Sequence, residues 1–167
     1  MSADRIFAKG IAGTIRLPKI DRSAWVSWAT FALGAELVRA DGLGAELHNP
    51  GQGIALVLGA IALFLALVLL IQRHMRLSLL ASTFGEPQQL VTSGWFRYSR
   101  NPIYVAFLLP IAALGYWSLV DAAATAFVYV VAMTTIVIAR EEQTLEANFG
   151  EIYLDYKART PRWFWLF

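Results

Sequence analysis

The sequence predicts an all-α, polytopic membrane protein with about four transmembrane helices and additional interfacial helices, folded as a single domain over residues 1–167. The first observation that predicts this class is the composition. Of the 167 residues, 57% are hydrophobic and 16% are charged, whereas ordinary soluble domains carry about 25% charged residues. The chain has no cysteine and two histidines, so a disulfide scaffold, a thiol catalyst or a metal site is not expected.

Four apolar stretches predict the spans, and the first two have few polar residues. The first stretch, residues 24–38, is short for a span and includes Glu36, so we expect helix tilt or local thinning of the bilayer to accommodate it. Residues 53–71 supply 19 positions without a charge, close to the roughly 20 that a helix needs to cross a bilayer core.

The third and fourth stretches follow each other closely. Residues 103–119 are apolar and contain Pro110, which predicts a kinked span. Residues 122–139 give 18 uncharged positions. A tight turn around Asp121 would make these two spans an antiparallel hairpin.

The basic residues predict the orientation, because lysine and arginine near span ends prefer the cytoplasmic side. With four spans and the N-terminus inside, 13 of the 14 basic residues are cytoplasmic, and Arg39 is the exception. An odd number of spans would destroy this asymmetry. We therefore expect both termini in the cytoplasm and, since no organelle signal is visible, a bacterial inner membrane.

Residues 1–22 form a basic arm without the apolar core of a cleavable signal peptide. Apolar residues at helical spacing among its basic residues favour a short helix in the cytoplasmic interface. A disordered basic arm fits the same residues equally well, and both interpretations stay open.

Most other polar residues lie in two stretches at the cytoplasmic ends of the hairpin. In the first, Asn101 and Pro102 indicate a helix start, because asparagine is a favoured N-cap and proline suits the first helical position. The N–H groups there, with Arg97 and Arg100, would form a site for a carboxylate or phosphate. The alternative is that both arginines anchor the span to lipid headgroups.

In the second stretch, Glu141 and Glu142 directly follow the fourth span. Apolar residues at helical spacing predict that the helix continues to about Tyr156 along the interface. Adjacent positions cannot share a helix face, so we expect one glutamate to face water and the other to face the first stretch. The alternative is that both are simply the solvated end of a span.

Two blocks of sequence carry a resemblance when taken together. The first contains Gly94-Trp95-Phe96 and Arg100-Asn101-Pro102-Ile103-Tyr104. The second contains Glu141-Glu142-Gln143-Thr144-Leu145 and Phe149-Gly150-Glu151-Ile152-Tyr153-Leu154-Asp155-Tyr156, and ends at Arg159-Thr160-Pro161-Arg162. These blocks resemble the isoprenylcysteine carboxyl methyltransferase family and the related phospholipid methyltransferases. The resemblance covers residues 90–162, whereas residues 1–80 match only as generic spans.

The resemblance implies an integral membrane enzyme that transfers a methyl group from S-adenosylmethionine to a lipophilic acceptor at the cytoplasmic boundary. It implies a cofactor pocket formed by the last helical hairpin and the C-terminal helix, with no metal. The acceptor, an isoprenoid or prenylcysteine carboxylate or a lipid headgroup, would come from the bilayer, and no nucleic acid partner is expected. The oligomeric state stays open.

The resemblance also assigns roles to residues. Those implied to bind the cofactor are Leu90, Val91, Thr92, Gly94, Tyr98, Arg100, Asn101, Pro102, Tyr104, Glu141 and Glu142. Those implied to act in catalysis are Arg100, Asn101 and Glu141, and those implied to bind the acceptor are Tyr153, Tyr156 and Arg159. Many family members carry histidine at position 101, so the asparagine here argues against a proton-transfer role.

The chemistry of these residues agrees with the implied cofactor. Its carboxylate suits Arg100 and a helix N-terminus, and its ammonium and ribose hydroxyls suit Glu141 or Glu142. Methyl transfer needs positioning and exclusion of water but no protein nucleophile. A carboxylate acceptor attacks directly, whereas an ammonium first loses a proton, for which a glutamate could serve as base.

Two other functions stay open at this point. A membrane reductase related to the sterol reductases would hold NADPH in a similar basic pocket. A non-catalytic membrane protein or transporter subunit would use the arginines as headgroup anchors, although the charges that mark a transport path are almost absent from the spans.

Overall fold

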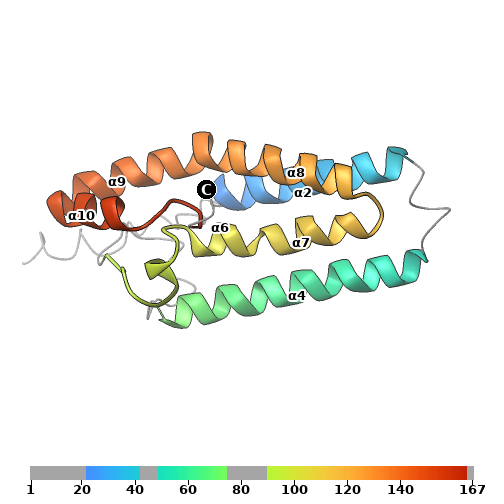
Figure 1. The fold of residues 1–167 in the computed structure, drawn as a ribbon, viewed down its shortest axis with the longest axis horizontal. Helices are drawn as coiled ribbons and strands as arrows, with labels where there is room; N and C mark the ends of the chain where they lie inside the picture. Colours follow the sequence, from blue (N-terminus) through green and yellow to red (C-terminus); the bar gives the residue numbers. More distant parts are fainter. Residues whose placement is uncertain (1–21, 42–48, 75–89, 165–167) are drawn as a thin grey trace, which may run out of the picture.

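The computed structural model describes residues 22–41, 49–74 and 90–164, which form helices and no strand (Figure 1). In chain order the elements are α2 (Arg22–Asp41), α4 (Pro50–His74), η1 (Gly94–Arg97), α6 (Pro102–Ala106), α7 (Leu108–Ala113), η2 (Leu114–Tyr116), α8 (Leu119–Ala132), η3 (Met133–Ile138), α9 (Ala139–Phe149) and α10 (Glu151–Arg159). η1 and η2 are 3₁₀-helices and η3 is a π-helix. The predicted all-α class is confirmed, while the basic arm, except Arg22, lies outside the described residues.

Four helical rods lie side by side in the described part of the chain (Figure 1). They are α2, α4, the broken rod α6–α7–η2 and the long rod α8–η3–α9. α2 packs mainly on α8, and α4 packs on α6 and α7. α10 turns back beside α9, and we call this end of the bundle the α10 end.

Two helices among the described residues are long and apolar enough to cross a membrane. They are Pro50–His74, with a mean hydropathy of 3.2, and Leu119–Phe149, with 2.1. The apolar helix Pro102–Tyr116 is shorter, and α2 has 20 residues but is less apolar. α4 presents leucines to the outside along its length, as a helix in contact with lipid does. The four-span topology therefore stays a prediction.

Close packing holds the rods together. A Cβ atom at Gly34 of α2 would lie 2.5 Å from the Thr125 Oγ1 atom of α8, so only glycine permits this approach. The Phe107 ring stacks on Tyr129 with 5.4 Å between ring centroids and meets Phe64 edge-on at 5.0 Å. Phe107 thus joins the third rod to α4 and to α8.

The third rod is broken at Phe107, as the proline in the sequence predicts. Pro110 has no N–H to donate to the carbonyl group four residues earlier, at Ala106, and α6 ends at that residue. The hairpin turn, however, lies at Trp117 and Ser118 rather than around Asp121. Ser118 caps α8 by accepting a hydrogen bond from the Asp121 backbone N–H at 3.2 Å, which draws Asp121 into the first helical turn.

The fourth rod departs from the predicted continuous helix at two places. η3 widens the helix, so that after Tyr129 and Met133 the two adjacent residues Val137 and Ile138 are both buried. At Gly150 the chain reverses with φ +51°, a conformation that favours glycine. The expected single interfacial helix to Tyr156 is therefore wrong: α9 and α10 are separate helices.

Candidate functional site

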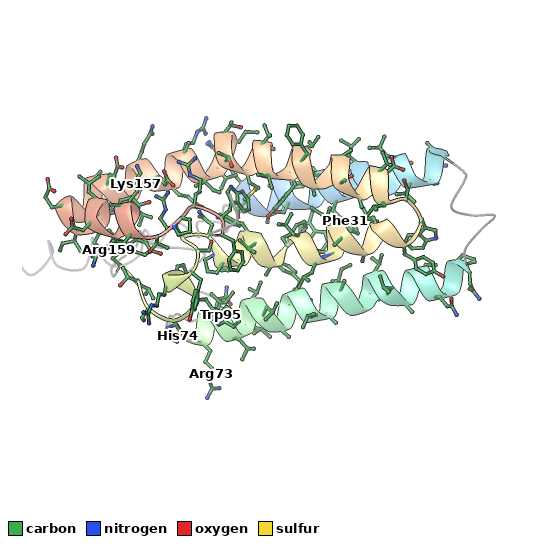
Figure 2. The ribbon with its side chains drawn as sticks, in the orientation of Figure 1. Phe31, Arg73, His74, Trp95, Lys157 and Arg159 are labelled. Carbon is green, nitrogen blue, oxygen red and sulfur yellow. The ribbon has the colours of Figure 1, made fainter. Side chains whose placement is uncertain are left out.

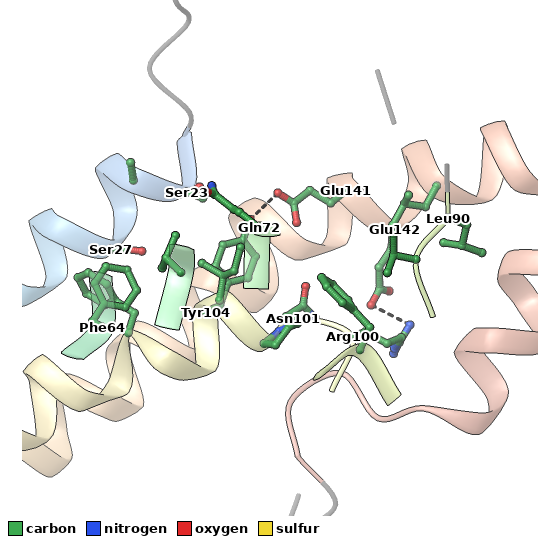
Figure 3. Close-up of a pocket in the computed structure, with 18 of the residues that line it drawn as sticks. Ser23, Ser27, Phe64, Gln72, Leu90, Arg100, Asn101, Tyr104, Glu141 and Glu142 are labelled. Carbon is green, nitrogen blue, oxygen red and sulfur yellow. Dashed lines mark hydrogen bonds and ion pairs between the residues drawn. The ribbon is translucent and has the colours of Figure 1, made fainter. Parts of the chain in front are cut away.

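A cavity of about 500 Å³ lies within the α10 half of the bundle (Figure 3). Its walls come from α2, α4, α6, α9, α10 and the chain before α6. The lining residues are Ser23, Ala24, Ser27, Trp28, Phe64, Leu65, Val68, Gln72, Leu90, Val91, Phe96, Arg100, Asn101, Pro102, Ile103, Tyr104, Phe107, Glu141, Glu142, Leu145, Tyr153 and Tyr156. Its size is typical of a site for a small molecule.

Glu142 is the centre of the charged part of this site. Its side chain is 8% exposed, and Arg100, 10% exposed, lies 3.0 Å from Oε1 through Nη1. Arg162 binds both carboxylate oxygens, with Nε donating to Oε1 at 2.9 Å and Nη2 to Oε2 at 2.7 Å. Lys157 Nζ lies 3.6 Å from Oε2. A buried carboxylate with these partners is compensated in charge and in hydrogen bonds.

Three surrounding cations decide the ionisation of Glu142. Burial opposes the charged form, but the hydrogen bond from Arg162 and the charges of Arg100, Arg162 and Lys157 outweigh it and hold the pKa of this carboxyl below its ordinary value. Glu142 is therefore an anion at neutral pH. It fixes Arg100 beside the cavity.

Arg100 has one N–H group that no described residue accepts from. Among the described residues its Nε atom is buried and has no hydrogen-bond partner, although Nη1 contacts Glu142 and lies 3.5 Å from the Tyr153 hydroxyl. A buried, unpaired donor costs free energy unless a ligand satisfies it. Arg100 is largely buried at the cavity, whereas Arg97 is exposed and does not line it. The predicted role of Arg100 in binding the cofactor stays a prediction.

The residues after α10, which we call the C-terminal strap (residues 160–164), pack against the segment that carries Arg100 and against η3. The Arg100 backbone N–H donates to the Pro161 carbonyl at 2.9 Å, and Ser99 Oγ donates to the Arg162 carbonyl at 3.2 Å. The Trp163 ring N–H donates to Thr134 Oγ1 in η3 at 3.1 Å. These contacts place the Arg162 side chain on Glu142.

Asn101 occupies the expected position before α6 but does not cap it through its side chain. The Asn101 Nδ2 atom donates to the Arg162 carbonyl oxygen at 2.8 Å. Ser99 Oγ instead accepts from the Asn101 backbone N–H at 3.0 Å. The predicted helix start is therefore confirmed, since Asn101 is the N-cap residue and α6 begins at Pro102, but the amide side chain bonds to the strap and not to the helix N-terminus. The predicted catalytic and cofactor roles of Asn101 stay predictions.

Glu141 also borders the cavity, so the expectation that one of the two glutamates faces water is wrong. The Tyr104 hydroxyl donates to Glu141 Oε1 at 2.6 Å, and the Tyr129 hydroxyl in turn donates to the Tyr104 carbonyl at 3.0 Å. The physical reason is η3, where the adjacent residues Val137 and Ile138 are both buried, so that the positions one turn later, Glu141 and Glu142, both face inward.

Two tyrosines of α10 form an uncharged wall. Tyr156 donates to the Phe96 carbonyl at 2.7 Å, and burial raises its pKa to about 12. Burial, with the nearby negative charge of Glu142, also raises the pKa of Tyr153. Both side chains line the cavity as neutral phenols, and their predicted role in binding the acceptor stays a prediction.

Four residues assigned by the resemblance do not line the cavity: Thr92, Gly94, Tyr98 and Arg159. Gly94, at φ +63°, packs against α4 so closely that a Cβ atom would lie 2.2 Å from the His74 ring. Arg159 is exposed and donates to the carbonyl of Asp155, one turn earlier in α10. Figure 2 shows His74, Trp95, Lys157 and Arg159 together at the α10 end.

The sequence alone does not reveal the contribution of α2 and α4. Ser23, Ser27 and Trp28 line the cavity from α2, and Gln72 lines it from the last turn of α4. The Gln72 Oε1 atom is buried and, among the described residues, has no hydrogen-bond partner. The one feature of the sequence that could have indicated this contribution is a glutamine, Gln72, at the end of an apolar run.

Comparison with known proteins identifies the family of the chain. The profile of the phospholipid methyltransferase family matches residues 52–152, more than half of the chain. The protein belongs to the phospholipid methyltransferase family. No match was found among curated proteins or among solved structures. The matched range includes most of α4, the hairpin and both glutamates, whereas α2, most of α10 and the strap lie outside it.

This family consists of membrane methyltransferases, which agrees with the two apolar helices long enough to span a bilayer. Within the described residues, no group of three or more histidine, aspartate or glutamate side chains is placed to hold a metal ion.

Proposed function

We propose that this methyltransferase transfers a methyl group from S-adenosylmethionine to a lipophilic acceptor at the cytoplasmic boundary of a bacterial inner membrane, with both termini in the cytoplasm. The observation that carries the proposal is the buried, unpaired Nε atom of Arg100 beside two carboxylates in one cavity. This pairing of opposite charges suits a zwitterionic amino acid group.

The residues present fit the cofactor. Arg100 would hold its carboxylate, since a guanidinium N–H and a carboxylate form a strong charge-assisted hydrogen bond. Glu141 would accept from its ammonium or ribose hydroxyls, because both oxygens of Glu142 already bind cations. Leu90, Val91 and Leu145 form an apolar part of the cavity wall. The bound cofactor supplies an electrophilic methyl group.

The chain itself then positions the acceptor and keeps water away. Glu142 fixes Arg100, and the C-terminal strap fixes Glu142 through Arg162. The apolar wall of Phe64, Leu65 and Val68 leads toward the middle of the bundle and suits a hydrocarbon chain. Holding the reacting groups together in a dry site supplies much of the rate enhancement that a displacement needs.

Equilibrium binding of S-adenosylmethionine to the detergent-solubilised protein tests the proposal. The decisive variant is Arg100→Lys, because lysine keeps a positive charge near Glu142 but has no Nε–H. We expect it to lose at least about tenfold in affinity, the equivalent of one charge-assisted hydrogen bond. The matched control is Arg97→Lys at an exposed arginine in the same segment, which should bind like the wild type.

Transfer of labelled methyl groups to extracted membrane lipids completes the test. Label in a lipid fraction supports a lipophilic acceptor, and label only in protein contradicts it. Absence of saturable binding by folded protein, or tighter binding of NADPH in competition, would overturn the proposal and favour the reductase.

A further inference from the structure

Gln72 gives the cavity a second polar point, separate from the Arg100–Glu142 pair. The Gln72 side chain lines the cavity, and its Oε1 atom is buried and has no hydrogen-bond partner among the described residues. Figure 3 shows Gln72 well apart from Arg100 and Glu142, toward the α2 side of the cavity. A buried carbonyl oxygen left unpaired is costly, so a ligand that donates a hydrogen bond there gains affinity.

Among the described residues, no side chain donates to this oxygen. The nearby candidate is the Tyr104 hydroxyl, and it donates to Glu141 at 2.6 Å. The Ser27 hydroxyl, on the α2 wall, is directed to the Met133 sulfur at 3.9 Å. Within the part of the chain that the structure describes, this oxygen is thus left for a donor that a ligand brings.

The face of α4 that lines the cavity indicates which ligand this is. Phe64, Val68 and Gln72 follow one another at four-residue spacing and so share one face of the helix. This face is apolar for two turns and becomes polar at the α10 end, over a length of about 12 Å. A molecule lying along it would have an apolar chain beside Phe64 and Val68 and a polar head at Gln72.

We propose that Gln72 recognises the headgroup of the methyl acceptor, by accepting a hydrogen bond from an N–H or O–H group of that headgroup. The inference rests on the proposed function, since it takes the second ligand of the cavity to be the acceptor. The cofactor is drawn to the Arg100 end by charge. Gln72 is a specificity-determining residue that lies outside the sequence blocks assigned by the resemblance.

Binding of short-chain diacyl phospholipids tests the proposal without any turnover. Three probes with identical acyl chains differ in their headgroup donors: ethanolamine carries N–H, glycerol carries O–H, and choline carries neither. Their dissociation constants are measured by the tryptophan fluorescence of the full-length protein, since Trp28 lines the cavity. The affinity for S-adenosylmethionine is measured separately on the same samples.

We expect the wild type to bind at least one donor headgroup about tenfold more tightly than choline, the worth of one hydrogen bond to a buried acceptor. The better of the ethanolamine and glycerol probes identifies the donor. Gln72→Leu should abolish this preference with S-adenosylmethionine affinity within about twofold of the wild type. Gln72→Glu keeps an acceptor oxygen and should retain the preference. The matched control, Gln143→Leu, changes an exposed glutamine of α9 and should bind all probes like the wild type.

Three results would overturn the assignment. They are a wild type that does not distinguish the headgroups, a Gln72→Leu variant that keeps the preference, and a tenfold loss of S-adenosylmethionine affinity in that variant, which would make Gln72 a cofactor contact. A failure of the proposed function looks different, because the wild type would then bind no S-adenosylmethionine at all.

Discussion

Glu142 is the residue whose loss should affect the site most. Replacing it with glutamine leaves Arg100 and Arg162 without a counter-charge in a buried place. Breaking a buried ion pair from one side costs roughly 3–5 kcal/mol. We therefore expect Glu142→Gln to lower the midpoint of thermal unfolding in detergent sharply. Glu151→Gln, at an exposed glutamate of α10, should leave it unchanged, and equal midpoints for the two variants would contradict the central role of Glu142.

The same carboxylate predicts a dependence of stability on pH. Since the pKa of Glu142 is lower in the folded protein than its ordinary value of 4.5, its stabilisation is complete above about that pH. The stabilisation is lost as the pH falls through the folded-state pKa. Unfolding midpoints measured from pH 7 to pH 3 should therefore converge for the wild type and Glu142→Gln at the acidic end. A constant difference across this range would contradict the prediction.

Asn101 should act through the strap rather than through a proton. Asn101→Ala removes the bond to the Arg162 carbonyl, worth about 1 kcal/mol, and should lower S-adenosylmethionine affinity several-fold. Asn101→Asp should be worse, because a carboxylate cannot donate to a carbonyl. The pH profile of methyl transfer by Asn101→Ala should match that of the wild type. A profile that loses one titration would instead show that position 101 takes part in proton transfer.

At the scale of elements, the C-terminal strap is required for the site but not for the bundle. A chain that stops after Arg159 loses the contacts of Pro161, Arg162 and Trp163 with Arg100, Glu142 and Thr134. We expect the helical content, measured by circular dichroism, to be nearly unchanged and S-adenosylmethionine binding to be lost. Wild-type affinity in the truncated chain would contradict this. Alanine replacement of Phe164, which is exposed, is the control.

The elements also mark how far the sequence could predict the fold. Composition and the apolar runs predicted the helices, and Pro110 predicted the break in the third rod. The wide turn η3 could not be predicted, because its residues, Met133–Ile138, are as apolar as those of an α-helix. The reversal at Gly150 was hidden by apolar residues that keep helical spacing across it. The hairpin turn was misplaced because Asp121 is a capping-region residue within α8.

At the scale of the whole molecule, the four-span topology predicts which positions face each side of the membrane. The chain has no cysteine, so single cysteines can report accessibility. Asn148→Cys, at the α10 end, should react with a membrane-impermeant maleimide only after the cells are permeabilised. Gly51→Cys, at the opposite end, should react in intact cells. Labelling of both positions in intact cells would exclude the proposed orientation.

The candidate site shows the same division between what sequence can and cannot predict. Arg100, Glu141 and Glu142 come from motifs and meet around one cavity, as expected from a helical hairpin. Gln72 and the α2 residues enter the site through packing between rods far apart in sequence, for which one sequence carries no signal. The partners of Glu142 likewise depend on the fold-back of α10 and the strap.

The π-helix η3 has a consequence for deletions. The π-helix adds one residue to the rod. A regular α-helix that directed Tyr129 and Glu142 in the same two directions would be one residue shorter between them. Deleting Ile136, an exposed residue of η3, should therefore restore an ordinary α-helix and leave both glutamates at the cavity. Deleting the exposed Phe127 from α8 should instead rotate every later residue by about 100°. We expect the protein without Ile136 to bind S-adenosylmethionine and the protein without Phe127 not to bind it. The rod would then tolerate the loss of a residue in η3 but not in α8.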